Sequence, residues 1–311
     1  MNNRTTTTGS GDIAPLVYTR RVRPRAVRLF IFAPLLLFAG SVSALSAFLV
    51  ATPPEVLQGD PVLVEVGNAP AVRSVTFDKR EFPVFAYQGK RVALVGVDLL
   101  KKPGRYTITA RASGALLSPT SIRVLKRATI IAPLGIPEKL GGNTKQAEAN
   151  LVTTLAKENA ALGKVKATLL PLWSEPFIFP VSNPVVTDEY GYTRRTGFVA
   201  IPHRGVDVHA DVGTPVHAIN NGVVRLAREF TVYGNTVALD HGGGVISLSV
   251  HLSRIQVKVG QKVKRGEVIG LSGESGYALS PHLHLSVRIG GISVDPMKFF
   301  TLLGPRSSIV F

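Results

Sequence analysis

Short segments in which apolar and polar residues alternate dominate residues 52–127. Turn residues separate these segments, as in GRYTITARA, where Tyr106, Ile108 and Ala110 alternate with polar positions after a Pro-Gly turn. Alternation places every second side chain on one face, which is typical of a half-buried strand. Strands at this spacing predict a small β-sandwich.

A run without charged residues covers residues 29–51, which is 23 positions. As a helix it would be about 34 Å long, enough to cross a hydrocarbon core of about 30 Å. Residues 1–28 form a basic leader, and five arginines stand directly before the run: Arg20, Arg21, Arg23, Arg25 and Arg28. Because basic residues stay on the cytoplasmic side, the pattern predicts a transmembrane helix or signal anchor with the remainder of the chain exported. A signal peptide cleaved near residues 44–46 is the alternative.

Helical periodicity replaces the alternation in the linker, residues 128–176. Residues 143–163 are predicted to form a helix that begins with a capping-box variant at Asn143 and Gln146 and ends at Gly163. The apolar stripe of this helix consists of Ala147, Leu151, Leu155 and Leu162. Such a stripe indicates a helix packed against a neighbouring domain.

Two histidines alternate with leucines in the segment HLHLSV near the C-terminus. In a strand, His282 and His284 point to the same face, whereas Leu283 and Leu285 point to the opposite, apolar face. The alternation therefore predicts a strand that presents two imidazoles to one surface.

An upstream segment, HRGVDVHA, places His203 and Asp207 four positions apart. We expect this segment to be a strand, so that both side chains share a face with only Gly205 between them. The missing side chain at Gly205 is expected to leave room for an ion.

Composition restricts the chemistry further. The net charge of +16 is spread along the chain and forms no clustered basic stripe, which argues against specific nucleic-acid binding and favours attraction to an acidic polymer or membrane surface. Cysteine is absent, which excludes disulfides, thiolate catalysis and cysteine zinc sites. All seven histidines lie between His203 and His284.

Two imidazoles and one carboxylate are a suitable zinc ligand set, since three protein ligands leave the fourth tetrahedral position for water. Bound zinc would activate that water and polarise a substrate carbonyl. No His-Glu-x-x-His helix is present, so another group must transfer protons, and the candidates are His251 and His282.

The remaining histidines, His209, His217 and His241, are interpreted as structural or surface residues. His209 could donate a hydrogen bond beside the metal.

Over about residues 177–300 these motifs, together with the stretches VHLS and VDP, resemble the lysostaphin/LytM-type zinc metallopeptidases of bacterial cell walls. The resemblance implies one zinc ion per chain, bound by His203, Asp207 and His284. It also implies that His251 and His282 are catalytic. Residues 177–311 are accordingly assigned to a metallopeptidase domain, and residues 52–127 are similar to the immunoglobulin-like module that precedes this domain in some envelope enzymes.

Two positions depart from the family pattern. The family often has tyrosine where this chain has Ser249, and glycine where it has Ser280. Both changes leave the implied ligands in place and bear on substrate placement and turnover.

The expected protein is mainly β. In chain order it has a membrane helix, a small β-sandwich, a linker helix and a β-rich LytM-type peptidase domain. The resemblance implies a zinc-dependent endopeptidase that hydrolyses peptide bonds in peptidoglycan stem peptides or cross-bridges. Such an enzyme would be anchored to the cytoplasmic membrane, with its catalytic domain on the outer side and envelope proteins as further partners. The alternative is a non-catalytic envelope protein that binds peptidoglycan or activates other wall hydrolases.

Overall fold

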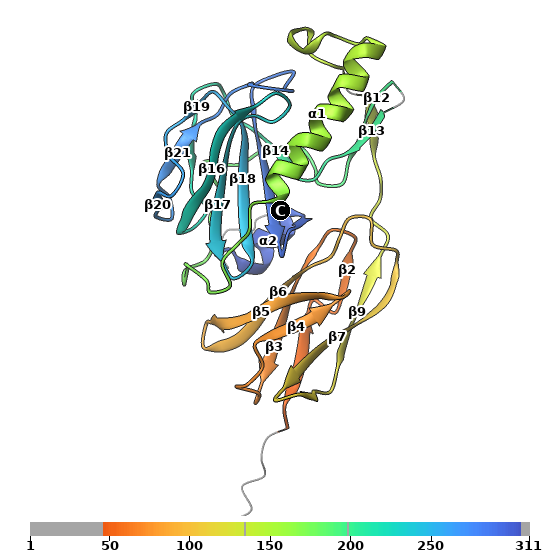
Figure 1. Cartoon of the computed structure of the whole chain (residues 1–311), viewed down its shortest axis with the longest axis vertical. Helices are drawn as coiled ribbons and strands as arrows, with labels where there is room; N and C mark the ends of the chain where they lie inside the picture. Colours follow the sequence, from red (N-terminus) through yellow and green to blue (C-terminus); the bar gives the residue numbers. More distant parts are fainter. Residues whose placement is uncertain (1–45, 134, 198, 306–311) are drawn as a thin grey trace, which may run out of the picture. The chain divides into compact units, whose positions relative to one another are not determined.

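The computed structural model describes residues 46–133, 135–197 and 199–305 (Figure 1). The leader 1–28 and most of the predicted membrane segment 29–51 lie outside these residues. Within the described ranges, no helix is both long and apolar enough to cross a bilayer. The predicted segment is wrong at its C-terminal end, because β1 (Phe48–Thr52) pairs antiparallel with β3 (Pro61–Gly67).

The first β-rich region is a nine-stranded sheet arrangement with strand order β1-β3-β6-β5-β4-β7-β9-β2, in which β8 pairs with β7. Its other strands are β2 (Glu55–Leu57), β4 (Ser74–Phe77), β5 (Arg80–Tyr87), β6 (Lys90–Gly96), β7 (Gly104–Ala112), β8 (Ala115–Leu116) and β9 (Thr120–Leu125). The strands expected between residues 52 and 127 are therefore present. The immunoglobulin-like assignment and the domain boundaries stay predictions.

Burial in this region follows the alternation of the sequence. In β3, Val62, Val64 and Val66 are buried, whereas Leu63 and Glu65 between them are only partly buried. Each buried valine removes apolar surface from water, worth about 1.5–3 kcal/mol per side chain. The pattern that predicts the strand thus also supplies its contribution to the core.

The linker contains β10 (Ile131–Pro133), the 3₁₀ helix η1 (Glu138–Leu140) and the helix α1 (Lys145–Gly163). The predicted capping box is wrong, because Thr144 is the N-cap and its hydroxyl accepts a hydrogen bond from the Ala147 N–H. The Asn143 side chain instead accepts a hydrogen bond from the Ile136 N–H. The predicted end of the helix at Gly163 is confirmed.

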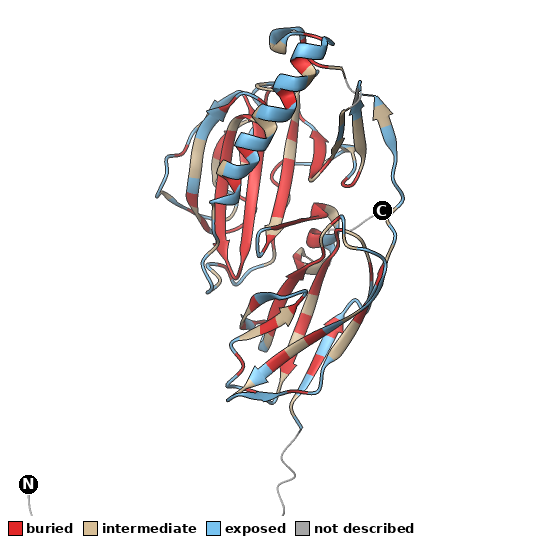
Figure 2. Ribbon diagram, turned by 45° about the vertical axis from the view of Figure 1, so that its right-hand side comes forward, coloured by how far each residue is buried: buried red, intermediate tan, exposed pale blue. Residues whose placement is uncertain are grey.

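The C-terminal region is built around an eight-stranded sheet with order β11-β14-β22-β18-β17-β16-β20, in which β23 pairs with β22. Its strands are β11 (Val186–Asp188), β14 (Val206–His209), β16 (Gly222–Phe230), β17 (Gly234–Gly242), β18 (Val245–Leu252), β20 (Lys262–Val263), β22 (His282–Ile289) and β23 (Ile292–Val294). The central strands β17, β18 and β22 are mostly buried (Figure 2).

Two smaller sheets and a helix complete this region. One sheet has the order β10-β12-β13 and the other β15-β21-β19. The bounds are β12 (Thr193–Thr196), β13 (Val199–Pro202), β15 (Pro215–His217), β19 (Arg254–Ile255), β21 (Val268–Leu271) and α2 (Pro296–Leu303).

Helix α1 packs on one face of the eight-stranded sheet, as its apolar stripe predicts. Near its C-terminal end, Leu162 belongs to a buried cluster with Leu248 and Val250 of β18. Near its N-terminal end, Leu151 clusters with Tyr277 and Val232. In Figure 2 the buried side of α1 faces the sheet and its exposed side faces outward.

The buried His241 in β17 should make the stability of this core depend on pH. Its side chain is fully buried, Nδ1–H donates to the Asn221 carbonyl (2.8 Å), and Nε2 accepts from the Ser247 hydroxyl (2.8 Å). Burial lowers the pKa of His241 to about 4, although the Asn221 carbonyl raises it. Between pH 6.5 and 4 the unfolded chain therefore binds a proton that the folded chain does not. This difference should lower the free energy of unfolding by about 2 kcal/mol from pH 7 to 5.

The contribution of His241 can be isolated with His241→Asn, which keeps a donor for the Asn221 carbonyl. Urea unfolding at pH 7 and at pH 5 should show a smaller loss of stability in this variant than in the wild type. Equal losses in both proteins would contradict the assignment.

Candidate metal and catalytic site

The site lies where β14 and β22 pair. These strands are antiparallel, and Asp207 stands directly opposite His284. Directly opposed residues share a face of the sheet, so the carboxylate and the imidazole meet, with Asp207 Oδ1 lying 2.8 Å from His284 Nδ1. The prediction that His282 and His284 belong to one strand is confirmed.

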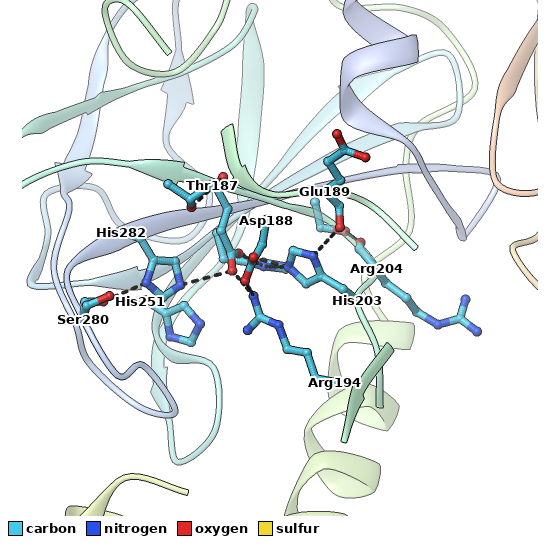
Figure 3. Close-up of polar contacts among 12 residues, drawn as sticks. Thr187, Asp188, Glu189, Arg194, His203, Arg204, His251, Ser280 and His282 are labelled. Atoms are coloured by element: carbon cyan, nitrogen blue, oxygen red, sulfur yellow. Dashed lines mark hydrogen bonds and ion pairs between the residues drawn. The ribbon is translucent and has the colours of Figure 1, made fainter. Parts of the chain in front are cut away.

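His203 reaches the site from a different backbone position than expected. The segment 203–207 is not a continuous strand, because β13 ends at Pro202 and β14 begins at Val206. His203 lies in the connection, where its Nδ1–H donates to the Glu189 carbonyl (2.9 Å) and its Nε2 lies 3.0 Å from Asp207 Oδ1 (Figure 3).

Gly205 makes room for a side chain of the site. A Cβ atom at this position would lie 2.5 Å from the Leu285 carbonyl oxygen and 2.6 Å from His284 Nε2. The expectation that the glycine leaves space for an ion is therefore wrong, since the space holds the His284 ring.

Gly205→Ala should displace the His284 ring and weaken zinc binding by about 10- to 100-fold, the range typical when the support of a metal-ligating histidine is lost. The overpacking should also destabilise the fold by about 1–3 kcal/mol. Competition titration with a chromogenic chelator measures the first effect and urea unfolding the second. Gly163→Ala is the matched control, because a Cβ at Gly163 meets nothing within 4 Å. Unchanged zinc affinity in Gly205→Ala would refute this role.

Three ligand atoms from His203, Asp207 and His284 lie within 4.8 Å of one another. The Glu189 carbonyl fixes the proton of neutral His203 on Nδ1, so Nε2 presents a lone pair toward the Asp207 carboxylate. Nε2 also lies 3.0 Å from His284 Nδ1. Three electron-pair donors that converge in this way require a cation or proton between them, and two imidazoles with one carboxylate are a donor set that suits zinc.

The electrostatics of the cluster agree with this donor role. Burial raises the pKa of the Asp207 carboxyl, but the close contacts with the His203 and His284 rings, and the positive charge of these rings when protonated, outweigh it and hold the pKa well below its usual range. Burial lowers the pKa of His284 to about 4, despite the opposing effect of Asp207. At neutral pH the carboxylate is therefore charged and the imidazole of His284 is neutral, as metal ligands must be.

Arg194 is a site residue that the sequence reasoning missed. Its guanidinium, on β12, forms ion pairs with the carboxylates of Asp207 and Asp188 (Figure 3). It holds Oδ2 of Asp207, while Oδ1 faces His203 and His284. No sequence signal points to Arg194, because it stands in the hairpin segment TRRT without a motif.

His251 joins the cluster through an unusual backbone conformation. Val250 lies opposite His284, so regular alternation would turn His251 to the other face. Instead His251 has a positive φ of 60°. Its ring centroid lies 4.9 Å from that of His282 and 6.1 Å from that of His284. Non-glycine residues in this conformation are uncommon and often stand at functional sites.

His251 and His282 each keep one ring nitrogen available. His251 Nδ1–H donates to the Ser275 carbonyl (2.8 Å), and His282 Nδ1–H donates to the Ser280 carbonyl (2.8 Å). Nε2 of His282 is buried without a hydrogen-bond partner among the described residues and lies 3.8 Å from Asp207 Oδ2. Burial, followed by the charges of His282 and His284, lowers the pKa of His251 to about 3, so His251 is neutral at pH 7.

Helix α1 supports this arrangement through Glu158, a buried acid within its apolar face. The Glu158 carboxylate accepts hydrogen bonds from the backbone N–H groups of Thr231, Val232 and Tyr233. The Tyr233 carbonyl in turn accepts from the His251 N–H (3.1 Å). The turn between β16 and β17 thus connects α1 to His251.

The positions that depart from the family pattern lie close to these histidines. Ser249 is buried and pairs with Leu285, one residue away from His284. Ser280 supplies the carbonyl that orients His282, which a glycine backbone could supply equally.

His217 and His241 make their hydrogen bonds outside the cluster, whereas His209 stands directly opposite His282 in the pairing of β14 with β22. His209 is exposed, and its Nε2 lies 3.9 Å from Asp211. His217 Nδ1–H donates to the Pro180 carbonyl (3.1 Å). The contact of His217 and the buried position of His241 agree with structural roles. The exposure of His209 agrees with a surface role, and the hydrogen bond from His209 beside the metal stays a prediction.

Residues 201–296 match the family model described as Peptidase family M23. This range contains all five candidate residues. The solved structure of an M23 family protein from Pseudomonas aeruginosa has a TM-score of 0.56 and 28% identity, and covers 80% of this chain and 95% of that chain.

Two curated relatives share the same region. Peptidoglycan DD-endopeptidase ShyA of Vibrio cholerae is 44% identical over 97 residues, which is 31% of this chain and 23% of the relative. Glycyl-glycine endopeptidase ALE-1 of Staphylococcus capitis is 42% identical over 113 residues, which is 34% of this chain and 31% of the relative. The matches thus span about a quarter to a third of these relatives.

Proposed function

We propose that the chain is a zinc-dependent endopeptidase that hydrolyses peptide bonds in peptidoglycan, a proposal supported by the match of residues 201–296 to the model of Peptidase family M23. The observation that carries the proposal is the convergence of His203, Asp207 and His284 within 4.8 Å, with two further imidazoles beside them. The names of the two relatives, a peptidoglycan DD-endopeptidase and a glycyl-glycine endopeptidase, support the substrate class.

His203, Asp207 and His284 would hold the zinc ion. When bound, zinc supplies Lewis acidity that lowers the pKa of water and polarises a carbonyl. Arg194 orients the Asp207 carboxylate by binding Oδ2, which leaves Oδ1 for the ion.

His251 and His282 would handle protons. Each donates Nδ1–H to a backbone carbonyl, so Nε2 can take a proton from the attacking water. After protonation the same Nε2–H can donate to the developing oxyanion and then to the leaving amine.

The proposed location is the cell envelope, with the peptidase domain outside the cytoplasmic membrane. The basic leader followed by an uncharged run carries this part of the proposal.

Digestion of purified peptidoglycan tests the activity. The zinc-loaded protein should release soluble peptide-containing fragments from the wall, a chelator should stop the release, and added zinc should restore it. Mass spectrometry of the released muropeptides identifies the bond that is cut, whether in a stem peptide or a cross-bridge. If the zinc-loaded protein leaves the wall intact while a proven peptidoglycan endopeptidase cuts it, the substrate assignment fails.

A further inference from the structure

A cavity of about 200 Å³ continues from the candidate site along the sheet. Its lining includes His203, His251 and His284, so the site opens directly into it. Leu151 and Leu155 of α1 form part of its wall. A ligand that reaches the histidines can therefore extend beneath α1.

One side of the cavity is formed by alternate residues of β22. His284, Ser286 and Arg288 all line it, while Leu285 and Val287 between them are buried in the core on the other face. Arg288 stands four residues from His284, which corresponds to about 13 Å along a strand. That distance matches three to four residues of an extended peptide.

The cavity has a strong charge asymmetry. Its described lining contains Arg194, Arg204 and Arg288 but no aspartate or glutamate. Arg194 is paired with Asp188 and Asp207, and Arg204 approaches Asp98 at 3.9 Å.

Arg288 differs from the other two arginines. Among the described acidic side chains, none forms an ion pair with it. Its Nη1–H donates to the Leu162 carbonyl (3.1 Å), and its Nε is buried without a hydrogen-bond partner in the described structure. A buried cationic donor without an anion is costly unless something compensates it.

We propose that this cavity is a subsite for a carboxylate carried by the peptide substrate, and that Arg288 binds that carboxylate. The proposal rests on the proposed peptidase function, because the peptide must span from the histidines to Arg288. The apolar wall formed by Leu151, Leu155 and Val250 would contact the aliphatic part of the ligand. The carboxylate can come from an acidic side chain or from the C-terminus of a stem peptide.

Three forms of one cross-linked peptidoglycan peptide separate these sources. The first form carries free carboxylates, the second has its side-chain carboxylate amidated, and the third has its C-terminal carboxylate amidated. The zinc-loaded wild type should show a kcat/KM about 10- to 100-fold higher for the free form than for one of the amidated forms. The amidation that lowers kcat/KM identifies the source of the carboxylate.

Arg288→Gln should lose this preference. Its kcat/KM for all three forms should equal the low value that the wild type shows for the disfavoured amidated form. Arg288→Lys keeps the charge and should keep part of the preference, and it serves as the second variant if Arg288→Gln is poorly folded. Arg105→Gln removes the same charge from an exposed position of β7 and should behave as the wild type.

A wild type that cuts all three forms equally would overturn the subsite. So would an Arg288→Gln protein whose kcat/KM falls equally for all forms, since Arg288 would then serve only to hold the end of α1. If the wild type cuts no form, the proposed function fails. Calorimetric titration then measures the affinity for each of the uncut peptides, which tests the subsite without hydrolysis. Tighter binding of the free form that Arg288→Gln abolishes supports it, and equal binding of all forms rejects it.

Discussion

His284→Ala should remove both the bound zinc and the hydrolysis of peptidoglycan. His284 contributes Nδ1 to a three-atom donor set, and its loss leaves only His203 and Asp207. Two protein ligands do not hold zinc in the geometry of a catalytic site. Because a bound zinc ion lowers the free energy of the charged transition state by several kcal/mol, its loss should reduce kcat/KM by at least about 10³-fold. Elemental analysis of the purified protein and muropeptide release measure the two losses.

A control is needed because His284 is also packed against Gly205. Circular dichroism and urea unfolding should show that His284→Ala is folded. His217→Ala is the matched histidine control, because His217 lies in β15 and bonds to the Pro180 carbonyl, away from the cluster. A folded His284→Ala protein that keeps stoichiometric zinc would contradict the ligand assignment.

Period-two alternation predicted the part of the site that lies in a regular strand. In β22 the alternation holds without interruption, so His282, His284, Ser286 and Arg288 share one face and the leucines face the core. The sequence reasoning stopped at the histidines, although the same rule extends to Arg288.

The same rule failed where the backbone is irregular. Pro202 ends β13, and the chain turns through His203 and Gly205 before β14 begins. A proline directly before His203 is a signal for such a break. The side chains of His203 and Asp207 still converge, because the Glu189 carbonyl holds the His203 ring in place.

Residues whose partners are distant in sequence could not be found by local patterns. Arg194 acts through an ion pair with Asp207, and Glu158 acts through backbone groups of the turn at residues 231–233. Glu158 does stand seven positions after Leu151 on the apolar stripe of α1. An acid at such a position predicts burial with a partner, but only the fold identifies the partner.

The sequence makes His251 a candidate for proton transfer, but alternation does not predict that its ring lies beside His284. Strand geometry alone would have turned its ring away from His284, because Val250 occupies the facing position. The left-handed backbone at His251 reverses that direction. The Glu158 carboxylate accepts a hydrogen bond from the Tyr233 N–H, and the Tyr233 carbonyl accepts one from the His251 N–H. These two bonds help to hold the backbone conformation of His251.

His251→Asn should separate proton transfer from metal binding. Asparagine tolerates the left-handed backbone at this position, but it has no ring nitrogen to accept a proton. Zinc should therefore stay stoichiometric, since the three ligands are unchanged, while kcat falls by about 10²- to 10⁴-fold. Steady-state kinetics on a soluble muropeptide, together with elemental analysis, measures both quantities.

Two outcomes would contradict this role. A kcat within tenfold of the wild type would mean that His251 transfers no essential proton, and the role would pass to His282, whose Nε2 lies 3.8 Å from Asp207 Oδ2. Loss of zinc would mean instead that His251 supports the ligands. Because His284→Ala should lose the metal and His251→Asn should keep it, the pair of variants distinguishes a metal ligand from a proton-transfer group within a single cluster of imidazoles.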